Sequence, residues 1–101
     1  MIFVIGSARY PASVMDQLRP HMAAVIEATL AEDGCLYYAF GEDVTDPGLL
    51  RISEVWRDQA ALDRHFTTPH MTEWKRARAA LGAGERNLTL YKGTGESQDL
   101  P

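Results

Sequence analysis

The sequence predicts an α+β domain of the ferredoxin-like class, with the element order strand, helix, strand, strand, helix, strand. Runs with strand character alternate with helical spacing in that order, and the 101 residues are enough for one domain only. Such an order folds as a four-stranded antiparallel sheet with its helices on one side. We assign the domain to residues 1–92 and expect residues 93–101, which are small and polar, to form a flexible tail.

Four runs have the β-branched and aromatic content and the alternation of strands. Proline, glycine and aspartate lie between these runs and end each of them, because they fix φ, remove an amide donor or favour turns. The middle two runs are separated by the turn sequence TDPG and should pair as an antiparallel hairpin. The expected strands cover residues 2–10, 35–43, 49–57 and 85–92.

Pro20 divides the first helical segment in this prediction. Ser13 is the expected N-cap, and apolar residues follow it at spacings of three and four. An internal proline removes one helical hydrogen bond and clashes with the preceding turn. We therefore expect a short helix over residues 13–18 and a longer one over 20–31, which Gly34 ends in a left-handed conformation.

The second helical segment has two start signals. Asp58 is a favourable N-cap for a first helix, and Thr68 followed by Pro69 restarts the helix, since proline suits the first helical position. The restarted helix should run to about Leu81, where glycines follow.

Charge and cysteine content exclude several classes of partner and location. The net charge of −4 and the pI near 5.2 disfavour nucleic acid and anionic lipid surfaces. No apolar run approaches the roughly 20 residues that span a bilayer. Cys35 is alone, so it forms no internal disulfide and is interpreted as a packed small residue rather than a nucleophile. These observations favour a cytoplasmic protein with no membrane or nucleic-acid partner.

The first strand is apolar on both faces, which predicts a homodimer. Ile2 and Val4 alternate with Phe3 and Ile5, and the second strand adds Tyr37 to the same outer face. Strands of this kind belong in sheets covered on both sides, but the chain has helices for one side only. An identical sheet from a second subunit is the simplest cover, related by a twofold axis.

Glu54 and Trp56 are candidate catalytic residues because they lie two positions apart and therefore share one sheet face. If that face meets the helices, the buried carboxylate must be paired, hydrogen-bonded or neutralised, and neutralisation would suit it for proton transfer. Two interpretations stay open for each residue. Glu54 either takes part in chemistry or holds an arginine or a backbone amide, and Trp56 is either core or a flat wall for an aromatic substrate.

His65 and His70 lie on either side of the junction between the two later helices. Histidine titrates nearest neutral pH and is the commonest general base, so His65 is the third candidate catalytic residue. The alternative is an interior histidine with satisfied hydrogen bonds. The two histidines lack the spacing of a helical zinc site, and no cysteine or carboxylate cluster completes a ligand set, so no metal is expected.

Aromatic and thioether side chains gather in the expected layer between helices and sheet. Stripes of this kind usually form core, but their position beside His65 and Glu54 makes them candidates for substrate contact. The candidate substrate-binding residues are Tyr38, Phe40, Phe66, His70, Met71 and Trp74.

Three segments together resemble the antibiotic biosynthesis monooxygenase family, including its quinol monooxygenases. They read EDGCLYY over residues 32–38, EVWRDQAALDRHF over 54–66 and PHM over 69–71. The resemblance covers residues 2–92 and implies a ferredoxin-like dimer whose sheets meet as an α+β barrel.

The resemblance implies an enzyme that oxidises a quinol or phenolic aromatic with O2, without metal, flavin or other cofactor. The anion of the substrate would supply the electron to oxygen, so the protein would bind a planar ring, remove a proton and exclude water. In this scheme Trp56 is the wall and orienting donor, His65 the base or anion stabiliser, and Glu54 an orienting or relaying carboxylate.

Two features leave other functions open. Some relatives use a pocket asparagine, whereas Asn87 is the only asparagine here and Gly6-Ser7 stand near the end of the first strand, which disfavours haem degradation. An isomerase of the same fold would need an inward arginine for phosphate, and Arg51 and Arg57 have the wrong strand parity. A non-catalytic dimeric protein that binds small molecules or acts in stress is the third reading.

Overall fold

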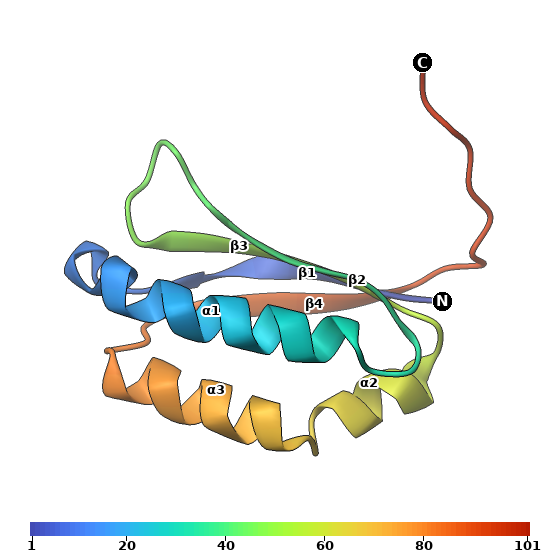
Figure 1. The fold of residues 1–101 in the computed structure, drawn as a ribbon. Coiled ribbons are helices and arrows are strands. Elements are labelled where there is room, and N and C mark those ends of the chain that lie inside the picture. Colours follow the sequence, from blue (N-terminus) through green and yellow to red (C-terminus); the bar gives the residue numbers. More distant parts are fainter.

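The computed structural model describes residues 1–101 and has the predicted order of elements (Figure 1). Three helices lie on one side of a four-stranded antiparallel sheet, which confirms the ferredoxin-like α+β class. No helix has the length and apolar character needed to cross a membrane. The strands are β1 (Ile2–Arg9), β2 (Cys35–Glu42), β3 (Leu49–Trp56) and β4 (Arg86–Lys92), and the helices are η1 (Ala12–Val14, a 3-10 turn), α1 (Met15–Leu30), α2 (Gln59–His65) and α3 (Pro69–Ala80).

The sheet order is β2-β3-β1-β4, so β1 lies inside the sheet and pairs with both β3 and β4. This position explains the dense apolar content of the first strand. The register places Val4 opposite Glu54 on one side and Leu90 on the other, and Tyr38 opposite Glu54. One row across all four strands therefore faces the helices at the level of Glu54.

Pro20 does not interrupt the first helix, and the prediction of two helices was wrong. α1 is continuous from Met15 to Leu30, with Pro20 in its second turn. Pro20 and Asp16 are both exposed, so the Asp16 carbonyl that loses its amide partner faces water. The missing bond is therefore tolerated at the solvent face.

Ser13 is not the cap of that helix. It lies inside η1, and the N-cap position of α1 is Val14, which offers no side-chain hydrogen bond. The 3-10 turn leads directly into the helix and takes the place of a side-chain cap.

The caps of the later helices are as predicted. Asp58 accepts a hydrogen bond from the Ala61 amide at 2.9 Å, and Thr68 accepts one from the Met71 amide at 3.4 Å, with Pro69 at the first helical position. The strands end within one residue of their predicted bounds.

Leu36 lies outside the alternation of inward and outward side chains in β2. The pairing between β2 and β3 shifts between Cys35 and Tyr37, so Leu36 is an unpaired bulge residue and is exposed. Cys35 instead packs on the helix side of the sheet, beside Trp56.

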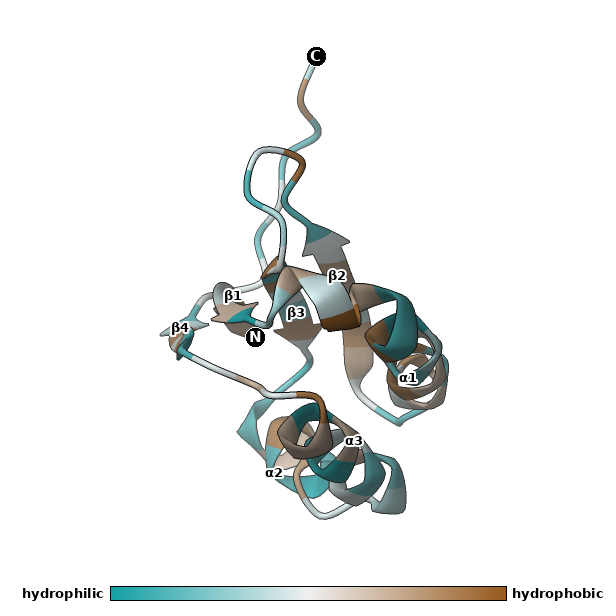
Figure 2. Cartoon of the chain, turned by 90° about the vertical axis from the view of Figure 1, so that its left-hand side faces the viewer, coloured by the Kyte–Doolittle hydropathy of each residue, from teal (hydrophilic) through white to brown (hydrophobic).

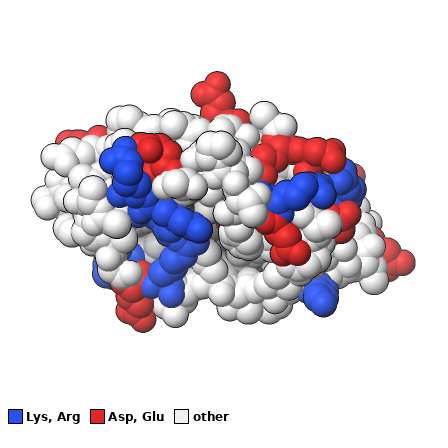
Figure 3. All heavy atoms as spheres, turned by 90° about the horizontal axis from the view of Figure 1, so that it is seen from below, with Lys and Arg blue, Asp and Glu red and all other residues white.

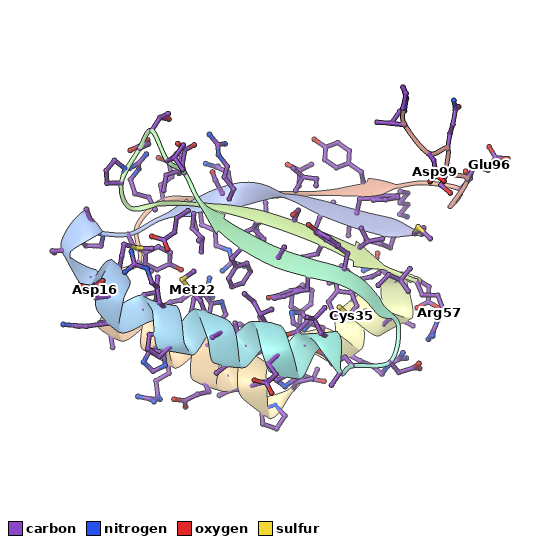
Figure 4. All side chains as sticks on the ribbon, turned by 45° about the horizontal axis from the view of Figure 1, so that its top comes forward. Asp16, Met22, Cys35, Arg57, Glu96 and Asp99 are labelled. Atoms are coloured by element: carbon purple, nitrogen blue, oxygen red, sulfur yellow. The ribbon has the colours of Figure 1, made fainter.

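The core lies in the single layer between sheet and helices. Figure 2 views this layer end-on, with α1 beneath the β2 side of the sheet and α3 beside α1. One cluster centres on Leu18 and Leu50, which are fully buried, and the other on Trp56 and Leu62. Figure 4 shows Met22 and Cys35 among the side chains that fill the layer.

The outer face of the sheet carries no helix (Figure 1). The row formed by Tyr37, Val55, Phe3 and Tyr91 crosses all four strands on this face. Ile5, Tyr37 and Tyr91 are each about half exposed, at 50%, 52% and 55%. A continuous apolar strip therefore faces outward.

Gly48 should be essential to the hairpin loop. Its φ is +90° and a Cβ there would lie 2.3 Å from the Tyr10 carbonyl oxygen, whereas a Cβ on Gly41 would meet nothing within 4 Å. We expect Gly48→Ala to lower the free energy of unfolding by about 1 to 3 kcal/mol. The control Gly41→Ala should stay within about 0.5 kcal/mol of wild type. Urea unfolding measures both, and equal effects would contradict this account.

Candidate functional site

A pocket of about 210 Å³ lies between the inner sheet face and the α2–α3 segment. Its floor is the row at the level of Glu54, and its opposite wall comes from α2 and the start of α3. Most of the lining is apolar, with a few polar groups, which is the usual composition of a small-molecule site. The lining residues are Val4, Tyr38, Glu54, Gln59, Leu62, His65, Phe66, Met71, Arg86, Leu88 and Leu90.

His65 is the nitrogen base of this pocket. It is the last residue of α2 and is only 1% exposed. Its ring centroid lies 4.7 Å from that of Trp56 and 5.4 Å from that of Tyr38. Burial lowers the pKa of His65, and the neighbouring carboxylate of Glu32 opposes that change. The imidazole is therefore favoured in its neutral form, which can accept a proton.

Glu32 joins the two candidate histidines, and sequence reasoning assigned it no role. Its Oε2 lies 2.6 Å from His65 Nδ1 and 2.7 Å from His70 Nε2. Glu32 stands in the turn after α1, which Gly34 completes with a φ of +86°. The only available signal was its place at the start of the EDGCLYY segment, which does not indicate a partner 33 residues away.

Glu54 and Trp56 bond to each other. Trp56 Nε1 donates to Glu54 Oε1 at 2.9 Å, so the buried carboxyl is satisfied by an indole and not by the arginine or amide considered above. Burial is the main cause that raises the pKa of Glu54. Trp56 is fully buried behind His65 and does not line the pocket.

Three of the other candidate residues line the pocket and three lie outside it. Tyr38, Phe66 and Met71 line the pocket. Phe40 and Trp74 stack on each other, with ring centroids 5.6 Å apart, outside that lining. His70 and Trp74 instead border a second hollow of about 80 Å³, together with His21 and Glu73.

Glu32, His65 and His70 offer three ligand atoms within 4.8 Å of one another. We expected no cysteine or carboxylate to complete a ligand set with the two histidines, and this was wrong, because Glu32 supplies such a carboxylate. Two histidines and one carboxylate form a known ligand set for divalent metals. However, the 2.6 and 2.7 Å separations are hydrogen-bond lengths, and ligands about 2.0 Å from an ion would have to move apart. As arranged, the three groups form a hydrogen-bonded cluster.

Arg86 adds a positive charge to the pocket lining. It lies at the start of β4 on the inward parity, whereas Arg51 is exposed and pairs with Asp43. On the face that Figure 3 shows from below, basic and acidic side chains lie next to one another in two groups, with uncharged surface between the groups. Arg86 is thus the cation placed to meet an anionic ligand group.

Replacing Glu54 by Gln should stabilise the fold at neutral and alkaline pH. A carboxyl whose pKa is raised in the folded state stabilises fully below its unfolded value near 4.5, and this contribution is lost as pH rises through the folded pKa. A glutamine oxygen can still accept from Trp56 Nε1 and carries no charge. Urea unfolding at pH 5 and pH 8 should show a gain for Glu54→Gln that is larger at pH 8; a loss at pH 8 would contradict the prediction.

Two proteins are similar to the chain in sequence. A protein of Synechocystis sp., itself uncharacterised, is 33% identical over 99 residues, which are 98% of this chain and 67% of that protein. A proposed monooxygenase of Mycobacterium tuberculosis is 40% identical over 58 residues, which are 57% of this chain and 56% of that protein.

Solved structures agree over the whole chain. A proposed antibiotic biosynthesis monooxygenase from Deinococcus radiodurans has a TM-score of 0.89 and 30% identity and covers 100% of this chain and 99% of its own. A second structure, from Mycobacterium tuberculosis, has a TM-score of 0.83 and 28% identity over 96% of this chain and 98% of its own. The family model for antibiotic biosynthesis monooxygenase matches residues 1–77, and the chain therefore belongs to that family.

Proposed function

We propose that the protein is a cofactor-independent monooxygenase that oxidises a small quinol or phenol with O2. The observation that carries this proposal is His65, a buried imidazole that lines an apolar pocket and is held by a carboxylate. Membership of the family agrees with it.

The size and lining of the pocket favour a single aromatic ring. A cavity of about 150 Å³ can hold benzene, so about 210 Å³ leaves room for a ring with small substituents. Tyr38, Phe66 and Met71 offer aromatic and thioether contacts on its walls.

The first chemical step would be removal of a phenolic proton by His65. The proton passes from the phenol oxygen to the ring nitrogen, and the electron-rich phenolate then reduces O2. For a phenol with a free para position, one oxygen atom enters the ring there and the other leaves as water, giving a quinone. For a hydroquinone, the oxygen atom enters at a free ring carbon beside a C–O carbon and the other leaves as water, giving a hydroxyquinone. The substrate supplies all the electrons, so the overall reaction balances without a reductant.

Trp56 and Glu54 would support this step by holding His65 in place. The indole N–H is engaged by Glu54, and the Trp56 ring packs against His65 at 4.7 Å. This arrangement supports a role in orienting the base rather than in touching the substrate.

The outer sheet face supports a twofold homodimer. The strip of Tyr37, Val55, Phe3 and Tyr91 spans the sheet, and a second copy presents the same strip. Self-complementary apolar faces bury each other in isologous dimers. In such an assembly the pocket stays on the helical side.

Arg86 supports a second candidate function, a non-redox enzyme such as an isomerase acting on an anionic substrate. Its place in the pocket lining supplies the inward arginine that such a reaction needs, and that Arg51 and Arg57 do not supply. The third reading, a binding protein without catalysis, shares the pocket, so activity assays decide among them.

We expect His65→Gln to lower oxygen uptake with hydroquinone roughly 100-fold, because a positioned general base contributes about that much. His21→Gln is the matched control and should retain activity, since His21 lies outside the pocket lining. An oxygen electrode measures the rate. Equal activity of wild type and His65→Gln would remove the histidine from the mechanism.

Ile5→Lys should convert a dimer into a monomer. Ile5 lies on the outer sheet face, 50% exposed, and a charge there would be buried without a partner. Val44→Lys is the control, because Val44 is 98% exposed in the β2–β3 loop. Sedimentation equilibrium at micromolar concentration reports the mass, and a monomeric wild type would contradict the dimer.

A further inference from the structure

One carboxylate oxygen serves both histidines at the α2–α3 junction. Glu32 Oε2 lies 2.6 Å from His65 Nδ1 and 2.7 Å from His70 Nε2. Each distance is that of a hydrogen bond and therefore needs one proton between the two atoms. With Glu32 as a carboxylate, both histidines donate to the same oxygen, and we take this arrangement as the basis of the proposal below. With its proton on Nδ1, His65 carries a lone pair on Nε2, the nitrogen for which no protein partner is found.

The junction holds the two rings in fixed places. Thr68 donates its hydroxyl to the His65 carbonyl at 2.8 Å and accepts from the Met71 amide at the start of α3. The end of α2 and the first turn of α3 are thus tied through one side chain. This tie fixes the backbones of His65 and His70 relative to each other.

The two histidines differ in their access to water. The His65 side chain is 1% exposed and borders the pocket, whereas the His70 side chain is 23% exposed and borders the outer hollow. The Glu32 side chain, at 12%, lies between them. A buried base is therefore connected to solvent through one carboxylate and one partly exposed imidazole.

We propose that Glu32 is the positioning residue of His65 and fixes its tautomer so that the unprotonated Nε2 faces the pocket. His70 shares the same carboxylate oxygen and thereby sets how strongly Glu32 stabilises a protonated His65. This inference rests on the proposed role of His65 as a base. When Nε2 takes the phenolic proton, the imidazolium forms while Nδ1–H stays donated to Glu32, whose charge stabilises it. His70 competes for the same oxygen, and a protonated His70 weakens the electrostatic stabilisation that Glu32 gives to the His65 imidazolium.

Other groups around His65 act on its proton affinity as well. Lys75 disfavours the charged imidazole, as does a protonated His70. Tyr38 lies against the ring, and Glu54 borders the same pocket with its carboxyl bonded to Trp56. None of these is within hydrogen-bond reach of Nδ1, so Glu32 is the group through which tautomer and charge are set.

Histidine-selective ¹⁵N NMR of the substrate-free protein tests the proposal without requiring turnover. In wild type, His65 should be protonated on Nδ1. Glu32→Gln should lower the pKa of His65 by about 1 or more and populate the other tautomer, because a carboxylate at this distance is lost. His70→Ala should raise the pKa of His65, since the carboxylate then serves His65 alone. Glu27→Gln, on the exposed face of α1, is the matched control and should change neither.

Two results would overturn the proposal. One is an unchanged tautomer and pKa of His65 in a folded Glu32→Gln protein, with thermal melting as the check of folding. The other is stoichiometric Zn²⁺ binding by the wild type that Glu32→Gln and His70→Ala each abolish, which would make the cluster a metal centre.

Oxygen uptake with a phenol series separates this inference from the proposed function. Glu32→Gln should slow weakly acidic phenols at least about tenfold but spare phenols already ionised at the assay pH. If neither the wild type nor any variant oxidises a phenol while the NMR result holds, the monooxygenase proposal fails and the positioning role stands. A uniform loss across the series would contradict the positioning role.

Discussion

The fold depends on one constraint, which is that three helices must cover the inner face of four strands. α1 lies along β2 and packs against α3, while α2 contacts β3. No helix makes comparable contact with β4, so the sheet and the helices separate on that side. Side chains of Val4, Leu88 and Leu90 fill the gap only in part, and the pocket is the space that remains. Its position follows from the shortage of helix rather than from any special loop.

The two interior carboxyls have different environments and so do different work. Glu54 lies at the centre of the sheet, where burial raises its pKa and the Trp56 indole supplies one hydrogen bond. Glu32 lies at the rim of the layer, where two imidazoles donate to it. Burial thus favours the neutral form of Glu54, whereas Glu32 is held between the two imidazoles by short hydrogen bonds. Glu32 is therefore placed to orient His65, whereas Glu54 mainly accepts the hydrogen bond of the Trp56 indole.

The parts of this fold that rest on local chemistry were predictable from the sequence. Caps such as Asp58 and Thr68, the proline at position 69 and the alternation of β3 act through near neighbours, and they have the predicted roles. Pro20 was misread because its cost depends on which side of the helix faces water, which only packing decides. The bulge at Leu36 was not predicted, because a bulge is defined by the pairing with the partner strand.

In the candidate site, too, local patterns were predictable and contacts between distant segments were not. Strand parity placed Glu54, Trp56 and Tyr38 on the helix side, and the pocket lining includes two of them. Glu32 could not be assigned to His65 from the sequence, because the contact joins a turn and a helix end 33 residues apart. Arg86 likewise acquires its place only through the pairing of β4 with β1.

The environment of the pocket leaves His65 as the group suited to accept a proton at neutral pH. Burial, the largest cause, raises the pKa of the Cys35 thiol to about 11, so this thiol, which lies beside Trp56 outside the pocket lining, stays protonated. Burial also raises the pKa of the Tyr38 hydroxyl, which keeps that phenol neutral. Burial acts on His65 in the opposite sense, favouring the neutral base. Burial therefore keeps the Cys35 thiol and the Tyr38 phenol protonated and keeps His65 neutral and able to accept a proton. The carboxylate of Glu32 then stabilises His65 once it is protonated.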